Sequence, residues 1–160
     1  MKIVKVISGG QTGADRAGLD AAISMGIPHG GRCPKGRRSE DGGVPESYDL
    51  KETVSSNYLI RTSLNVKDSD ATLIFTFGRP FSGSKRTIDF CIDHERPYMH
   101  VDLYLDKTLE EHAGDIRKWL ESTLSGEVTI NIAGSRESKA CGIHSRTKQI
   151  IELLLKKCNE

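Results

Sequence analysis

VISGGQTGADRAGLDAA, residues 6–22, is the stretch of sequence that decides the fold class. An apolar, β-branched run that begins at residue 2 leads into the turn Ser8–Gly13, and an alanine-rich segment follows. Such a run with glycines directly after it is typical of a strand, and small residues at helical spacing indicate a helix over 14–25. The face of that helix directed at the sheet would carry Ala14, Ala17, Gly18, Ala21, Ala22 and Met25. The stretch therefore predicts a strand, a glycine-rich turn and a helix that packs closely on a sheet.

The rest of the chain repeats this alternation of strand and helix. Strands are expected at 2–7, 70–77, 96–105 and 127–134, and helices at 14–25, 47–66, 87–95, 107–124 and 143–157. Alternation of this kind favours a doubly wound, mainly parallel sheet of five main strands, with helices on both of its faces. The length of 160 residues suits a single domain spanning 1–160.

Two of the expected helices would carry marked faces, and one loop is unusually long. Helix 47–66 would carry Leu50, Val54, Tyr58 and Arg61 on one side, and helix 143–157 would carry Ile143, Thr147, Ile150 and Leu154. Apolar positions on helices 47–66 and 106–124 would serve either the core or a partner subunit. The polar segment 26–47, called the long loop below, has a length that is usually functional or disordered.

Charge and hydropathy exclude several classes of partner. The chain has 23 Lys and Arg residues against 22 Asp and Glu residues, a formal net charge of +1. No overall field therefore attracts nucleic acid or membrane, and neither is an expected partner. Lys5 interrupts a short apolar run at the N-terminus, so no signal peptide is expected. No segment approaches the roughly 20 apolar residues of a membrane-spanning helix. The cytoplasm is the expected location.

The four cysteines, Cys33, Cys91, Cys141 and Cys158, are scattered and form no Cys-x-x-Cys pair. This spacing favours neither a zinc site nor a disulfide scaffold, and no cysteine or histidine cluster suggests a metal ligand set. Cys33 lies in the polar long loop. It is expected there either as a solvated thiol or as a reactive one.

Three glycine-containing turns follow strands, at 8–13, 78–87 and 132–138. Right-handed crossovers place every strand-to-helix loop of such a sheet at one edge, so the three turns should face one another. In the first turn, glycines permit close approach to the main chain, and the next helix offers N–H groups and the positive end of its dipole. The first turn is therefore expected to bind a phosphate-like anion, with Thr12 as a hydroxyl donor. A helix cap made by Ser8 or Thr12 is the alternative.

The glycines of the first turn lead to two more specific predictions, one about Gly10 and one about the class of ligand. A side chain at Gly10 should project into the ligand space, so that Gly10→Val would block binding while the core survives. The order of glycines is G-G-x-x-G, not G-x-G-x-x-G, and no acidic residue closes the second strand. Dinucleotide binding of the usual NAD type is therefore not expected.

The other two turns and the long loop add candidate anion ligands. The second turn places Gly83, Ser84 and Thr87 at a helix start beside Lys85 and Arg86, although capping by Ser82 or Ser84 explains it equally well. Its Gly-Ser-Lys order does not match a P-loop. The third turn offers Gly134, Ser135 and Arg136. Arg32, Lys35, Arg37 and Arg38 of the long loop form either a solvated patch or a set of cations over the turns. The second possibility would suit a small ligand with more than one negative group.

Four blocks of the sequence resemble the molybdenum cofactor carrier proteins. They are ISGGQTGADRAGLDAA (7–22), GGRCPKGRRSEDG (30–42), RTSLNVKDSDATLIF (61–75) and NIAGSRES (131–138). That family lies in a Rossmann-like superfamily with the lysine-decarboxylase-like nucleotide phosphoribohydrolases. The resemblance implies a Rossmann-like fold, a homo-oligomer (dimer or tetramer), and binding of the molybdenum cofactor, a phosphate-bearing pterin, without catalysis. It implies a cradle of Gly9, Gly10, Thr12, Gly13, Asp15 and Arg16, with Gln11 in the same turn.

The second glycine turn departs from the pattern of the relatives. It reads Ser82-Gly83-Ser84 where many relatives have two glycines and a threonine. The hydrolases carry P-G-G-x-G-T-x-x-E there and need the glutamate, whereas this chain has Thr87, Ile88 and Asp89. Two alternatives to a carrier stay open, a hydrolase of nucleotide N-glycosidic bonds and a sensor of nucleotide derivatives. In a hydrolase, Asp15, Glu40 or Asp89 would supply the acid or base.

Overall fold

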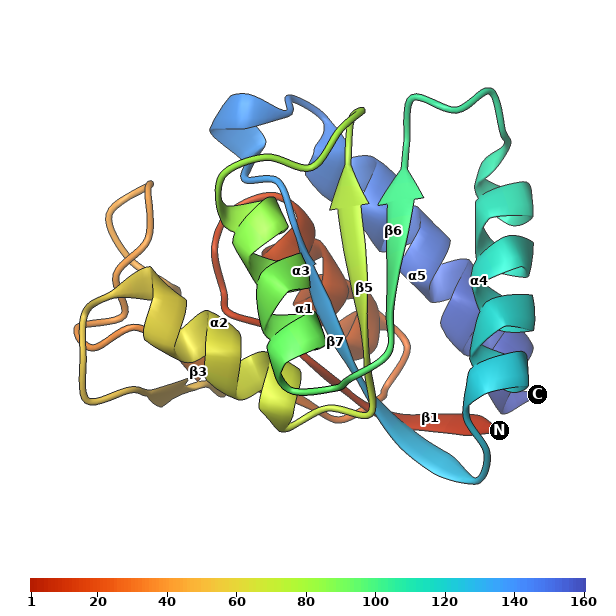
Figure 1. Cartoon of the computed structure of the whole chain (residues 1–160), viewed down its shortest axis with the longest axis horizontal. Coiled ribbons are helices and arrows are strands. Elements are labelled where there is room, and N and C mark those ends of the chain that lie inside the picture. The colour runs from red at the N-terminus through yellow and green to blue at the C-terminus, as the bar shows by residue number, and fades with distance from the viewer.

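A computed structural model describes residues 1–160 and contains a five-stranded, wholly parallel sheet (Figure 1). The strand order across the sheet is β2-β1-β7-β5-β6. The strands are β1 Lys2–Ile7, β2 His29–Gly30, β5 Ala71–Thr76, β6 Tyr98–Asp102 and β7 Glu127–Gly134. The central strand of the sheet is thus the last strand of the chain. No helix is both long enough and apolar enough to cross a membrane.

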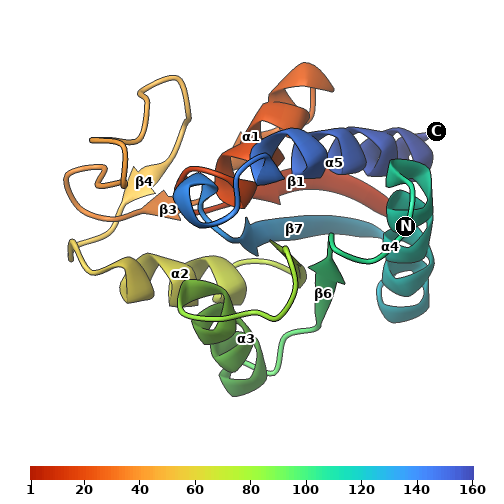
Figure 2. The same cartoon turned by 90° about the horizontal axis from the view of Figure 1, so that it is seen from above.

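Helices cover both faces of the sheet, which confirms the doubly wound, Rossmann-like α/β fold. Figure 2 shows α1 and α5 on one side of β1 and β7, and α2 and α3 on the other. The helices are α1 Ala14–Ser24, α2 Tyr58–Lys67, α3 Gly83–Asp93, α4 Leu109–Thr123 and α5 Ile143–Asn159. Helix α4 packs against α5 and completes the first layer.

The core forms where apolar strand residues meet the small or apolar faces of the helices. All six residues of β5 are buried, because strands of a parallel sheet are covered on both faces. On α1, Gly18 allows the close packing that its small residues predict, since a Cβ atom there would lie 2.6 Å from Cβ of Ile132 on β7. Met25 is the exception on that face and is 38% exposed. On α5, Ile143, Thr147, Ile150 and Leu154 are all buried as expected.

The topology opens a crevice between β7 and β5. Helix α5 follows β7 on one face of the sheet, while α3 follows β5 on the other face (Figure 1). The two loops that leave these neighbouring strands therefore diverge. Ligands of open α/β sheets bind at such a divergence, beyond the carboxyl ends of the strands.

The expected helix 47–66 is wrong in its first half. The helix begins only at Tyr58, and Asn57 caps it by accepting a hydrogen bond from Leu59 N. Val54, expected on the same side of this helix as Leu50, Tyr58 and Arg61, is 93% exposed. The run of threonine, serine and asparagine before Tyr58 favours turns and caps over helix interior. In its place, β4 Lys51–Glu52 pairs with β3 Arg32–Cys33.

The long loop contains short strands and its own small core. Strands β2 and β3 lie within it, and β2 forms one edge of the main sheet. A second hydrophobic cluster joins Leu19 of α1 to Cys33, Val44, Tyr48 and Leu50. Cys33 is completely buried there, so the prediction of a solvated or reactive thiol is wrong. Burial raises the pKa of the Cys33 thiol, which makes it a poor nucleophile.

Other boundaries differ less. Helix α3 begins at Gly83, four residues before the expected start at 87, so the second glycine turn forms the first turn of the helix itself. Strand β6 is shorter than the expected 96–105.

Candidate anion-binding site

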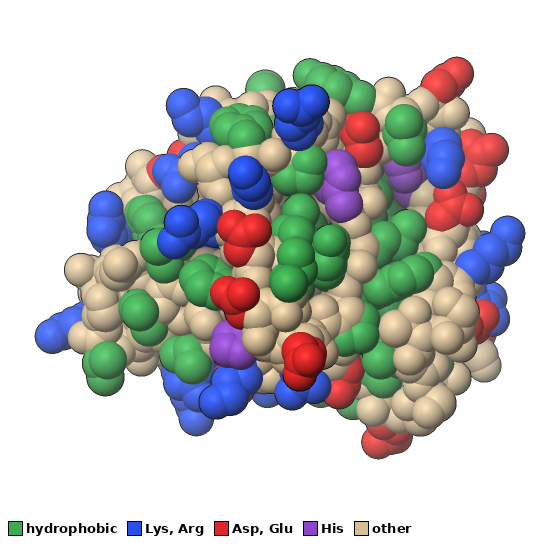
Figure 3. Space-filling view, in the orientation of Figure 1, with side chains coloured by type: hydrophobic (Ala, Val, Ile, Leu, Met, Phe, Trp, Pro, Cys, Tyr) green, Lys and Arg blue, Asp and Glu red, His purple; other side chains and the backbone are tan.

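A cleft of about 260 Å³ opens beyond the carboxyl ends of β7 and β5. Its walls are formed by four segments: the turn after β1, the start of α2, the start of α3 and the turn after β7. This cavity is called the cleft below. Its charged lining residues are Arg61, Arg136 and Lys139 against the single carboxyl group of Asp15. Figure 3 shows Lys and Arg side chains gathered on this part of the surface, around the starts of α2 and α3. The excess of cations suits an anionic ligand.

The start of α3 is the part of the cleft best suited to an anion. The N–H groups of Gly83 and Ser84 make no hydrogen bond within the protein, and Ser82 does not cap the helix with its side chain. Gly83 and Ser84 both line the cleft, and a Cβ atom at Gly83 would meet nothing within 4 Å. Thr87 also lines the cleft, and its hydroxyl donates to Gly83 O at 3.0 Å and so supports this turn. Free N–H groups and the helix dipole together attract anions.

The N–H groups of the turn after β1 are largely paired with acceptors of the protein itself, which the sequence does not indicate. Gln11 N donates to Oδ2 of Asp15 at 3.2 Å, and Thr12 N donates to Oε1 of Gln11 at 3.1 Å. Ala14 N, in the first turn of α1, donates to Ser135 O at 3.2 Å. The protein's own oxygen atoms therefore accept most of the hydrogen bonds that we expected a phosphate to accept.

The glycines of this turn face different neighbours. Gly9 lines the cleft, together with Gln11 and Asp15. Gly10, with φ of 78°, faces the long loop: a Cβ atom there would lie 2.8 Å from Cδ1 of Leu50 and 2.9 Å from Cγ1 of Val44. The expectation that a side chain at Gly10 would enter the ligand space is therefore wrong.

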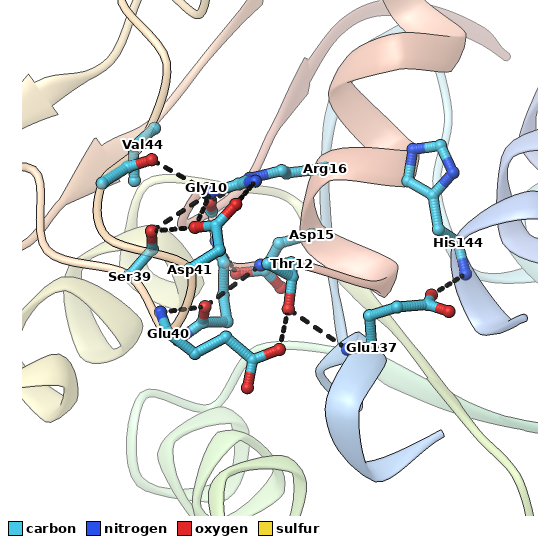
Figure 4. A network of polar contacts seen from close by, with 12 residues as sticks. Gly10, Thr12, Asp15, Arg16, Ser39, Glu40, Asp41, Val44, Glu137 and His144 are labelled. Carbon is cyan, nitrogen blue, oxygen red and sulfur yellow. Dashed lines mark hydrogen bonds and ion pairs between the residues drawn. The ribbon is translucent and has the colours of Figure 1, made fainter. Parts of the chain in front are cut away.

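Gly13, Thr12 and Arg16 hold neighbouring segments together. A Cβ atom at Gly13 would lie 2.4 Å from Ser135 O, so the first and third turns are in direct contact, as predicted. Arg16 donates through Nε to Gly10 O at 3.0 Å and pairs with Asp41 of the long loop at 2.5 Å (Figure 4). Hydrogen bonds from Arg16 and Ser39 hold the pKa of Asp41 far below its usual range.

A buried ion pair forms the floor of the cleft. Asp15 is only 5% exposed, and Nη1 of Arg61 lies 3.8 Å from its Oδ2. Burial raises the pKa of the Asp15 carboxyl, and the Arg61 guanidinium opposes that rise. A Cβ atom at Gly9 would lie 2.6 Å from Nη1 of Arg61, so glycine is what admits this arginine.

Two buried donors near the floor have no partner. They are Nε of Arg61 and Nε2 of Gln11. Buried polar groups in native proteins are nearly always paired, and each unpaired one costs about 1–3 kcal/mol. Both atoms are N–H donors, so a ligand that stabilised this region would bring an acceptor to it.

Tyr58 and Arg61 belong to the cleft, although sequence reasoning assigned them only to a helix face. Three guanidinium groups surround the Tyr58 ring: Arg38 at 4.5 Å, Arg61 at 5.4 Å and Arg136 at 5.8 Å from its centroid. Asn57 was the sequence signal that could have placed these two residues in the cleft. A helix cap at Asn57 puts Tyr58 in the first turn of α2, at the sheet edge.

The structure does not bring the basic residues of the long loop together over the cleft. Arg37 donates to four carbonyl oxygens, those of Val44 and Pro45 in the loop and of Tyr48 and Leu50 just after it. Arg32 pairs with Asp68 at 3.1 Å, and Lys35 is exposed away from the cleft lining. Of the four, only Arg38 approaches the cleft, through Tyr58.

The third turn lines the cleft, whereas only one of the expected acids does. Gly134, Ser135 and Arg136 all line the cleft. Asp89 is exposed on α3 and does not line it, which leaves Asp15 as its only carboxyl group. No group of three or more His, Cys, Asp or Glu side chains is placed to hold a metal ion.

Comparison with known proteins places these features in a family. Residues 6–155 match the model of the circularly permutated YpsA SLOG family. A crystal structure of a "putative molybdenum carrier protein" from Syntrophus aciditrophicus is similar to this chain, with 44% identity and a TM-score of 0.88 over 96% of this chain and 95% of that one. No curated protein matches the chain significantly. The resemblance to the molybdenum cofactor carriers is thereby confirmed.

The strand order has the form that a circular permutation leaves. Moving β7 and α5 to the front of the chain would give the order 3-2-1-4-5 that is common in Rossmann-like sheets. The matched residues, the similar crystal structure and this strand order agree, and the chain belongs to the circularly permutated YpsA SLOG family.

Proposed function

We propose that this protein is a carrier that binds the molybdenum cofactor, or a closely similar phosphate-bearing pterin, in the cleft. The observation that carries the proposal is the uncapped start of α3, where Gly83 and Ser84 line a cleft with three cations and their N–H groups have no partner in the protein. The name of the 44%-identical neighbour supports a carrier of molybdenum in particular.

The cleft fits a phosphate at one end and a ring at the other. Gly83 and Ser84 would hold the phosphate, with Arg136 and Lys139 beside it. The ring would lie toward Tyr58 and the floor, where the unpaired donors of Gln11 and Arg61 would meet its acceptor atoms. Molybdenum is cargo in this proposal: the residues present fit the phosphate and the ring of the cofactor.

The other residues of the expected cradle would act indirectly. Gly9 would make room for Arg61, and Asp15 would fix its guanidinium. Gly10, Gly13 and Arg16 would hold the turns and the long loop in place. Thr87 would support the start of α3.

A charge placed at Gly83 tests the proposal. Gly83→Asp would put a carboxylate at the start of α3, where it favours the helix but repels a bound phosphate. The space around Gly83 is open, so the fold should survive. Calorimetric titration with the cofactor should show at least a tenfold loss of affinity for Gly83→Asp and little change for the isosteric control Gly83→Asn. Equal affinities for the two variants would refute a phosphate site at this helix.

A second candidate is hydrolysis of a nucleotide N-glycosidic bond, and the raised pKa of Asp15 in the cleft favours it. A general acid or base must reach the substrate, and Asp15 is the only carboxyl group that lines the cleft. We expect no release of base from nucleoside monophosphates. Turnover that Asp15→Asn abolished would replace the carrier with an enzyme. Tight binding of AMP without turnover would favour a nucleotide sensor.

We further propose that the chain forms a homo-oligomer in the cytoplasm. Large apolar side chains are exposed along β6 and just after it, at Tyr98, Tyr104 and Leu105. All four cysteines are free, as is usual in a reducing compartment. Light scattering should give the mass of a dimer or tetramer. A monomer at high protein concentration would exclude self-association.

A further inference from the structure

The carboxylate of Glu40 lies beside Arg136, a residue that lines the cleft, and accepts a hydrogen bond from Thr12 (Figure 4). This position is called the mouth of the cleft below. Oε1 of Glu40 accepts hydrogen bonds from the hydroxyl of Thr12 and, at 3.3 Å, from Ser138 N. Its Oε2 accepts from the hydroxyl of Ser138 at 2.6 Å and lies 3.7 Å from Nη1 of Arg136. Although Glu40 belongs to the long loop, its side chain is only 17% exposed.

The donors belong to the sheet edge, whereas the acceptor alone comes from the loop. Thr12 is in the turn after β1, and Arg136 and Ser138 follow β7. Thr12 Oγ1 also accepts a hydrogen bond from Glu137 N at 3.2 Å, which leaves its hydrogen directed at Glu40. Burial alone would raise the pKa of Glu40, but the hydrogen bonds from Ser138 and Thr12 outweigh burial and lower it. Thr12, Ser138 and Arg136 are therefore arranged to bind an anionic group, and the carboxylate of Glu40 is the group that they bind in this structure.

We propose that Thr12, Ser138 and Arg136 form a second anion subsite, which Glu40 occupies and from which a second phosphate or carboxylate group of the ligand displaces it. The inference rests on the proposed function, because Arg136 also lines the cleft and would join the two subsites. It names the ligand class more closely: a molecule with two anionic groups, one at the start of α3 and one at the mouth.

The surrounding contacts allow Glu40 to leave while the loop stays in place. Asp41 is held by Arg16 through two hydrogen bonds, at 2.5 and 2.8 Å, and Ser39 by Arg16 at 3.1 Å. Neither contact involves the Glu40 carboxylate. Rotation of the Glu40 side chain alone then vacates the subsite. Repulsion between the negative ligand and the Glu40 carboxylate lowers the affinity of the subsite for the ligand.

Removing the charge of Glu40 should raise the affinity of the subsite for an anion. The experiment is an amide NMR titration of the full chain with inorganic phosphate, comparing wild type with Glu40→Gln. Glutamine keeps the size of glutamate and one acceptor oxygen but carries no charge. The loop stays attached through the contacts of Arg16 with Ser39 and Asp41. We expect the Ser138 amide to respond at a phosphate concentration at least tenfold lower in Glu40→Gln than in wild type. The gain should be lost in the double variant Glu40→Gln, Ser138→Ala, read at Glu137.

Glu46→Gln is the matched control, because Glu46 lies in the same loop and its side chain is 90% exposed. It removes one negative charge without touching the subsite, and its titration should match wild type. An equal gain in Glu46→Gln, or no gain in Glu40→Gln, would overturn the proposal. The amides of Gly83 and Ser84 report separately on the start of α3. If the Gly83 and Ser84 amides did not respond to phosphate while the Ser138 amide did, the proposed function would be refuted and the second subsite would be retained.

Discussion

At the scale of single residues, the two adjacent glycines of the first turn have opposite surroundings. Gly9 lies beneath the guanidinium of Arg61 at the floor of the cleft, whereas Gly10 lies beneath Val44 of the long loop and Leu50, which follows that loop. Sequence reasoning treated them alike, because both follow a strand and precede a helix. Which side each one faces depends on Arg61 and on the folded loop, and no local pattern contains that information.

Gly9→Ala should therefore weaken ligand binding with little effect on folding. The new methyl group would lie 2.6–2.7 Å from the guanidinium of Arg61, the mobile end of a long side chain, which would shift. Loss of one charge-assisted contact, worth roughly 1.5–3 kcal/mol, should lower affinity about tenfold or more. Calorimetry with the cofactor and urea unfolding would measure the two effects.

Gly10→Ala is the contrasting variant. Its φ of 78° and its contacts with Leu50 and Val44 oppose any side chain. We expect the free energy of unfolding to fall by about 1–3 kcal/mol, with ligand affinity nearly unchanged at temperatures where the protein stays folded. The reverse pattern, in which Gly10→Ala impairs binding and Gly9→Ala impairs folding, would contradict this assignment of the two glycines.

At the scale of elements, helix α3 begins from a strained residue. Ser82 has φ of 51° and ψ of −123°, a conformation that is essentially restricted to glycine. Many relatives have glycine in this motif, so the departure noted in the sequence has a structural cost. The strain lies directly before the free N–H groups of Gly83 and Ser84.

Ser82→Gly should stabilise the protein by about 1 kcal/mol, because relief of backbone strain exceeds the greater freedom of glycine in the unfolded chain. Chemical denaturation would measure it. Ser125→Gly is a suitable control, since Ser125 is an exposed loop residue without positive φ and should become slightly less stable. A loss of stability in Ser82→Gly equal to that of the control would mean that the turn is unstrained in solution.

The long loop should detach from the sheet edge in acid. The pKa values of Asp41 and Glu40 are lowered in the folded protein, from 3.8 and 4.5 respectively. A carboxyl group whose pKa is lower in the folded state stabilises that state fully when the pH lies above its pKa in the unfolded chain. The stabilisation is lost as the pH falls through its pKa in the folded protein. Hydrogen exchange at Val44, whose N–H donates within the loop, should therefore accelerate below about pH 4 relative to β5. In Asp41→Asn, exchange at Val44 should already be fast at neutral pH.

At the scale of the whole molecule, the sequence predicts the architecture better than the site. Strand β5 and helices α1 and α5 were identified because burial makes their patterns continuous or periodic. Strand β2, of two residues, carries no periodic signal, and it lies inside a segment taken for loop. The cleft was located at the correct edge through the glycine turns. Its floor was missed, because Tyr58 and Arg61 reach it only when α2 begins at its actual cap.

The two chain ends lie together, so the permutation should be reversible. The Asn159 side chain accepts from Ile3 N and donates to Ile3 O, both at 3.0 Å. A chain that joins the ends through a short Gly/Ser linker and opens at residues 125–126, before β7, should fold to the same sheet. Circular dichroism, cooperative unfolding and an unchanged affinity for the cofactor would confirm this. A chain that did not fold would show that the natural order of strands is required.

The central position of the last strand also determines when the protein can fold during synthesis. Until β7 leaves the ribosome, the nascent chain holds β1 with β2 and β5 with β6 as two separate ribbons, since each borders the gap that β7 fills. Their unpaired edges can join those of another nascent chain, and such edges promote aggregation. The sheet cannot close until β7, the last of its five strands, has been synthesised. A chain that stops early at a premature stop codon therefore yields no folded fragment that could bind ligand, only a substrate for chaperones and proteases.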